Sequence, residues 1–230
     1  MNTKMTKYLL LLSCFLYCQL STAAVVSWVD WSYINPERTS FNGVVDGIDV
    51  SFSGSFYDFH YPVSGGSTNF WEAPSSVTAN TYSASPLVDN APPDSDIIVM
   101  QEAGTRTITF SQPVDNPEMS ILSMGSSATP VEYQFNTGFN ILSVGPGTFD
   151  PSGNGTLTKL SNNVLQGVEG HGLIQFTGTY TSISWDVNVF EDFHGIQIGV
   201  GSSVVPIPPA VWLFGSGFIG LIGIARRRKA

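Results

Sequence analysis

The chain has 230 residues, and 42% of them are hydrophobic, which is enough to form a sizeable core. It carries nine lysines and arginines against eighteen aspartates and glutamates, a formal net charge of −9 at pH 7. Because phosphate backbones are bound by positive surface, this balance argues against nucleic acid as a partner.

Residues 1–24 predict a secretory signal peptide. Two lysines precede the apolar run Tyr8–Leu20, and small residues follow it, with cleavage expected after Ala23 or Ala24. The apolar run is shorter than the ~20 residues that a membrane span needs, which disfavours an uncleaved anchor. A lipoprotein signal at Leu-Leu-Ser-Cys14 is the other alternative. Cleavage would remove both cysteines of the chain, so the mature protein is expected to have neither a disulfide nor a thiolate site.

Residues 25–203 are predicted to form the folded ectodomain. This part holds only three basic residues, with all eighteen acidic ones, and so carries a net charge of −15. Such a charge suits solvation outside the cell, divalent cation binding, or contact with neutral or cationic polymers.

The ectodomain is expected to be all-β. Apolar and polar residues alternate with period two in short runs separated by Gly, Pro, Asn, Asp and Ser, and no window shows sustained helical periodicity. The predicted strands are Gly47–Ser53, Ile97–Gln101, Thr105–Ser111, Met119–Met124, Val131–Asn136, Phe139–Val144, Thr156–Leu160, Leu173–Thr177, Ser182–Val189 and Gly195–Val200. This pattern predicts an antiparallel β-sandwich of the jelly-roll type. Residues 69–95 are predicted to be a long loop within it; a linker between two domains is the alternative.

Several aspartates are candidate ligands for calcium, because hard cations bind clustered carboxylate and carbonyl oxygens. The candidates are Asp46, Asp49, Asp94, Asp96 and Asp150. In the loop Asp150–Gly155, an Asx-type turn is the competing interpretation.

Four aromatic residues are candidate platforms for stacking a sugar ring. They are Trp28, Trp31, Trp71 and Tyr82. Trp185 is instead predicted to lie in the core, because it alternates in phase with Ile183 and Val187.

The three histidines, His60, His171 and His194, lie near acids and could serve a hydrolase or a metal. The chain has no G-x-S-x-G, H-E-x-x-H or P-loop motif, so no catalytic residue is assigned and a non-enzymatic protein is expected. A secreted hydrolase that acts on polysaccharide is the alternative function.

The last 27 residues predict a membrane segment. Residues 210–225 contain no charge and would span about 24 Å as a helix at 1.5 Å per residue. With residues 207–209 the segment approaches the ~30 Å of a hydrocarbon core. The basic residues of the tail 226–230 are expected to stay in the cytoplasm, which places the ectodomain outside. These residues are Arg226, Arg227, Arg228 and Lys229.

A proline-rich segment, residues 204–209, precedes the apolar stretch. Proline fixes φ and pushes the preceding residue to extended geometry, so this segment is expected to be stiff and extended. Proteases bind substrates in extended form, which makes it a candidate recognition site. The motif residues are Val205, Pro206, Ile207, Pro208 and Pro209.

This combination of proline motif, glycine-containing span and arginine cluster resembles a PEP-CTERM sorting signal of the V-P-L-P-A type. It departs from that pattern at Ile207 and Pro209. The resemblance implies recognition by an exosortase, a membrane protease or transpeptidase. The protein would sit once across the inner membrane with its ectodomain in the periplasm, and would reach the cell surface or the medium after processing. A permanent anchor is the alternative.

Two segments, Thr107–Val114 and Glu169–Phe176, loosely resemble domains found upstream of other such tails. The resemblance implies a β-sandwich of the lectin or carbohydrate-module kind. Together these expectations describe an exported envelope protein, structural or associated with exopolysaccharide.

Overall fold

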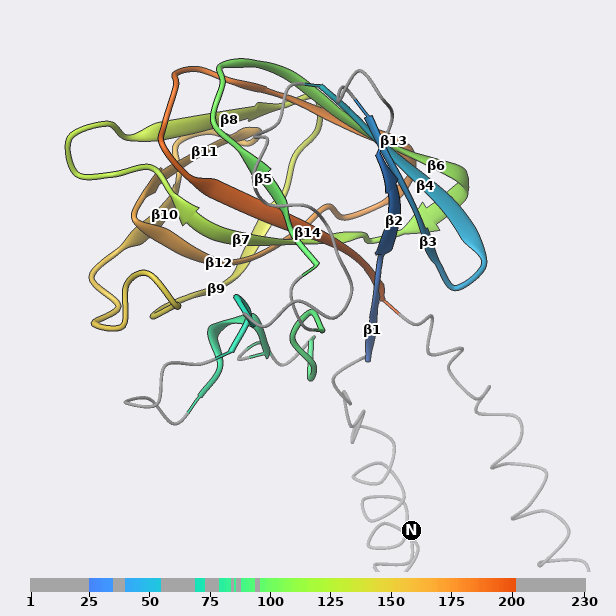
Figure 1. Ribbon diagram of the computed structural model, residues 1–230, viewed down its shortest axis with the longest axis horizontal. Helices are drawn as coiled ribbons and strands as arrows, with labels where there is room; N and C mark the ends of the chain where they lie inside the picture. Colours follow the sequence, from blue (N-terminus) through green and yellow to red (C-terminus); the bar gives the residue numbers. More distant parts are fainter. Residues whose placement is uncertain are drawn as a thin grey trace, which may run out of the picture.

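The computed structural model describes residues 25–34, 40–54, 69–72, 79–83, 85, 88–93 and 96–201. Within these ranges the protein is all-β, apart from a 3-10 turn at Thr81–Ser83, and its strands form two antiparallel sheets (Figure 1). The prediction of an antiparallel β-sandwich is therefore confirmed. The predicted signal peptide and the tail 204–230 lie outside the described residues, as do His60 and Asp94. No helix in the described part is long and apolar enough to cross a membrane.

The six-stranded sheet has β14 in its interior. Along the sheet the order is β1 (Val26–Trp28), β14 (His194–Gly201), β7 (Glu118–Met124), β12 (Gly170–Gln175) and β9 (Asn140–Val144). The short β5 (Ile98–Met100) pairs with the beginning of β14, and β1 pairs with its end, so these two strands share one side of β14.

The eight-stranded sheet packs against it. Its order is β10 (Thr156–Lys159), β11 (Val164–Val168), β8 (Val131–Phe135), β13 (Thr179–Val187), β6 (Gly104–Asp115), β4 (Ile48–Gly54), β3 (Ser40–Val45) and β2 (Asp30–Ile34). Each of the ten predicted runs overlaps a strand of one of the two sheets. Four strands were not predicted from the sequence, namely β1, β2, β3 and β11.

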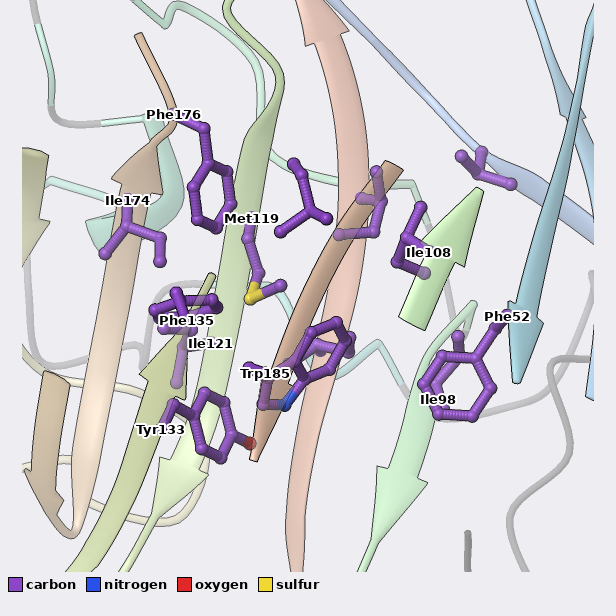
Figure 2. Close-up of a cluster of buried hydrophobic side chains, with 14 of the residues drawn as sticks. Phe52, Ile98, Ile108, Met119, Ile121, Tyr133, Phe135, Ile174, Phe176 and Trp185 are labelled. Carbon is purple, nitrogen blue, oxygen red and sulfur yellow. The ribbon is translucent and has the colours of Figure 1, made fainter. Parts of the chain in front are cut away.

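The main core lies between the two sheets. Tyr133, Phe135 and Trp185 project from the eight-stranded sheet toward Met119 and neighbouring apolar residues of the other sheet (Figure 2). Trp185 is only 1% exposed, which confirms its predicted place in the core.

A second apolar layer covers the outer face of the six-stranded sheet. Trp71 and Tyr82 pack edge to face, with ring centroids 4.9 Å apart, and belong to a cluster that includes Ile97, Val99 and Leu122. The described parts of residues 69–97 thus lie against this sheet (teal to green in Figure 1). As a result, β7 is buried along its whole length.

A hydrogen-bonded glutamine fastens the first strands to β14. The Trp31 indole donates to Gln197 Oε1 at 2.7 Å, and Gln197 Nε2 donates to the Val29 carbonyl at 2.9 Å. Gln197 is fully buried, so these bonds satisfy its polar atoms within the protein.

Candidate functional site

Two of the three candidate histidines are core residues. His171 Nδ1 lies 2.9 Å from the Tyr82 hydroxyl, and His194 Nδ1 lies 2.8 Å from Glu191 Oε2. Burial lowers the pKa of His171 to about 4, although the negative charge of Asp150 opposes the shift. Burial also lowers the pKa of His194 against the opposing effect of Glu191. Both rings have no exposed surface, so the structure places neither where a substrate could touch it.

The structure does not gather the four described calcium candidates into one site. Asp46 and Asp49 belong to the β3–β4 hairpin, Asp96 is buried ahead of β5, and Asp150 lies in the β9–β10 loop. Within the described ranges, no three His, Cys, Asp or Glu side chains form a possible metal site.

Asp150 instead organises its own loop. Its Oδ1 accepts a hydrogen bond from Ser152 Oγ at 2.5 Å, and its Oδ2 accepts one from the Gly155 N–H at 2.6 Å. Partial burial opposes ionisation, but these hydrogen bonds outweigh it and lower the pKa of Asp150. The Asx-type turn is the correct interpretation of this loop.

The stacking prediction needs a correction. Trp28, Trp31, Trp71 and Tyr82 are all buried, because they fill the two apolar layers of the sandwich. None of the four presents an open ring face to a ligand.

Phenylalanines occupy the surface instead. The phenylalanine cluster consists of Phe70, Phe149 and Phe193; the Phe149 ring centroid lies 5.0 Å from that of Phe193 and 6.2 Å from that of Phe70. Phe149 is 49% exposed, while Phe70 beneath it is buried. Phe190, in the same loop as Phe193, is 48% exposed. A large exposed aromatic ring that packs on other aromatic rings is a candidate interaction site.

The loop that carries Phe149 is held firmly. The Thr148 hydroxyl donates to the Phe70 carbonyl at 3.0 Å, and the Asp150 turn closes the other side of the loop. Gly147 packs directly on a buried histidine ring: a Cβ there would lie 2.2 Å from His171 Nδ1. Only glycine therefore fits this close approach.

The loop 188–193 is tied down as well. The Glu191 N–H donates to the Gln101 carbonyl at 3.0 Å, and the Gln101 side chain donates to the Asp192 carbonyl. Together with the Glu191–His194 bond, these contacts fix the loop on the start of β14. The exposed rings thus stand on a preorganised support, which lowers the entropic cost of binding.

Three carboxylates accompany the rings. Asp150 follows Phe149 in the chain, and Glu191 follows Phe190. The third is Glu169, whose pKa is raised by burial and by the negative charges of Glu191 and Asp150. In the described part of the chain the only basic side chains are Arg106, which is buried, and Lys159, which lies 4.9 Å above the Phe139 ring. The site is therefore aromatic and negative, and suits neutral or cationic ligands.

Aromatic rings and fixed carboxylates are the groups with which proteins contact sugars. Ring faces pack against the apolar side of a pyranose, and fixed carboxylates accept hydrogen bonds from its hydroxyls. A local sequence pattern marks these residues, although it was not among the predictions. Phe149-Asp150 and Phe190-Glu191 both place an aromatic residue beside an acid in a predicted loop.

No family model, curated protein or solved structure matches the chain. Its function has therefore to be inferred from the geometry and chemistry of its own residues.

Proposed function

We propose that this is an exported bacterial envelope protein, delivered by a C-terminal sorting signal, whose sandwich binds polysaccharide without hydrolysing it. An exosortase-type protease would cut near residues 204–209 after residues 210–225 have entered the inner membrane. The mature domain would then stay at the surface or leave the cell.

The arrangement of the described ends supports a tethered domain. Val26 and Gly201 are register partners on β1 and β14, so the segments before and after the sandwich join it side by side. The strand order supports a jelly roll, because β5, β14, β7 and β12 alternate along the chain with β6, β13, β8 and β11 in the other sheet.

The binding proposal depends on one observation: Phe149 is half exposed on a rigid loop and is flanked by carboxylates. His171 and His194 are fully buried, so neither can act as the acid or base of the alternative function, hydrolysis.

Replacing Phe149 with alanine is expected to weaken binding to a glycan array by about 2- to 10-fold, because an aromatic contact is worth about 0.5–1.5 kcal/mol. The assay uses the full-length protein in detergent, with and without calcium. Phe149→Tyr keeps the ring and should keep the binding. Leu160→Ala removes an equally exposed apolar side chain from β10–β11 and serves as the control. If the parent and the three variants all bind equally, or if none of them binds, the phenylalanine cluster is not a glycan-binding site.

The sorting proposal predicts loss of the C-terminal end. With an epitope tag at residue 230 and another after residue 24, the mature protein in the native host should keep only the second. Blots of the cell fractions report both tags. A mature protein that keeps the terminal tag would be permanently anchored, and one confined to the cytosol would not be exported.

A further inference from the structure

The outer face of the eight-stranded sheet carries rows of neutral polar side chains. In the first row, direct register partners on β3, β4, β6 and β13 stand next to one another. These partners are Asn42, Ser51, Thr109 and Ser182. Their sequence neighbours Phe52, Ile108 and Ile183 point the other way, into the core, so the row faces solvent.

A second row runs parallel to the first. Ser53 pairs with Ser40 and with Thr107, and Thr107 pairs with Ser184. Asn136, the residue after β8, extends the row, and its Oδ1 accepts a hydrogen bond from the Ser184 N–H at 3.1 Å. We call these two rows the hydroxyl face.

The hydroxyl face is hollowed at two places. One hollow of about 440 Å³ has a lining that includes Asn42, Asp49, Ser51, Thr109 and Ser111. Another of about 190 Å³ includes Gln134, Asn136, Ser184 and Asp186 in its lining. Each hollow has a single carboxylate, Asp49 in one and Asp186 in the other, and its other polar lining groups are hydroxyls, amides and backbone.

The spacing of this face matches an extended glycan. Neighbouring strands lie ~4.8 Å apart, which is comparable to the length of one pyranose unit in an extended chain. A glycan lying across the strands would therefore meet one polar side chain per sugar. Hydroxyl and amide groups can both donate and accept, as sugar hydroxyls do. The threonines are also stiff about χ1, so the row is preorganised.

We infer that the hydroxyl face is a second binding site, for an extended, uncharged polysaccharide that runs across β3, β4, β6 and β13. The inference deepens the proposed function, since it names the class of polymer. The face has no basic residue to attract an anionic polymer. It also lacks the exposed aromatic residues that enrich protein–protein interfaces, which disfavours a second copy of the chain as its occupant.

The test is cosedimentation of the full-length protein in detergent with microcrystalline cellulose and with chitin, two insoluble neutral polysaccharides. A triple variant, Ser51→Ala with Thr107→Val and Thr109→Val, removes three hydroxyls and keeps both shape and β propensity. The variant removes up to three hydrogen bonds to the glycan, so we expect a loss of affinity of about tenfold or more. Ser127→Ala, in an exposed turn away from this face, is the matched control and should bind as the parent does.

The outcomes separate this site from the phenylalanine cluster. The inference is wrong if the parent and the triple variant bind cellulose or chitin equally. It is also wrong if the parent binds neither polysaccharide. If Phe149→Ala loses array binding while the triple variant keeps it, the proposed function stands whatever the hydroxyl face does. A parent that is dimeric by light scattering, with a monomeric triple variant, would overturn the inference in favour of self-association.

Discussion

Replacing Trp185 with alanine is expected to lower the free energy of unfolding by about 3–5 kcal/mol. The side chain is 1% exposed, and its ring centroids lie 6.2 Å from that of Phe52 and 6.0 Å from those of Tyr133 and Phe135. Removing it leaves a void at the centre of the main core, which close-packed neighbours on both sheets can only partly fill.

Urea denaturation followed by circular dichroism measures this loss. Phe190→Ala is the control, since that side chain is half exposed and its removal should change stability by no more than about 0.5 kcal/mol. A loss below about 1 kcal/mol for Trp185→Ala would mean that the two sheets do not pack as described.

Glu118→Gln is expected to stabilise the protein by up to about 3 kcal/mol at pH 8 and to have no such effect below pH 4.5. Glu118 lies in β7, is 2% exposed and accepts a hydrogen bond from Gln175 Nε2 at 2.8 Å. Burial raises the pKa of its carboxyl group from 4.5 to about 7, and the Gln175 bond opposes the rise only in part.

The sign of the effect follows from the proton. Between pH 4.5 and about 7 the folded state holds a proton on Glu118 that the unfolded state has released, so stability falls as pH rises through this window. Glutamine is neutral at every pH and avoids that loss. Unfolding midpoints of the parent and the variant from pH 4 to pH 9 provide the measurement, with the exposed Glu102→Gln as control. If the midpoints of the parent and of Glu118→Gln change with pH in the same way, the pKa of Glu118 is not raised by folding.

His171 acts in the opposite direction. Its folded-state pKa of about 4 lies below the ordinary value of 6.5, so its contribution is complete above pH 6.5 and is lost as pH falls toward 4. The stability of the parent protein is therefore lowered by His171 at acid pH and by Glu118 at alkaline pH. Removing the Glu118 carboxyl should shift the stability maximum to higher pH.

Most strands were readable from the sequence, because runs of apolar and β-branched residues are separated there by turn residues. The strands that escaped prediction are short or weakly patterned: β1 has three residues, and Gly167 interrupts β11. The β3–β4 hairpin did have a local signal, Asp46-Gly47, whose φ angles of 49° and 77° are those of a type I′ turn.

The candidate site was less readable, because sequence patterns report size and polarity but not which layer a residue enters. Trp71 and Tyr82 lie in a segment rich in small polar residues, which is typical of exposed loops. Their burial results from a second apolar layer on the six-stranded sheet, and nothing in the local sequence requires that layer. The exposure of Phe149 has the same origin, since buried Phe70 supports it from a distant part of the chain.

If the chain is exported as proposed, the interior position of β14 sets an order of events. A chain that crosses the membrane from its N-terminus delivers β14 last, yet the six-stranded sheet needs this strand between β7 and the pair β1 and β5. The sandwich therefore cannot close until residue 201 has left the membrane. At that point residues 204–209 are the next to cross. Residue 204 follows Gly201 by three residues, which can span at most about 10 Å. In the proposed route, the processing enzyme would then cut next to the folded sandwich, or cut before β14 has docked.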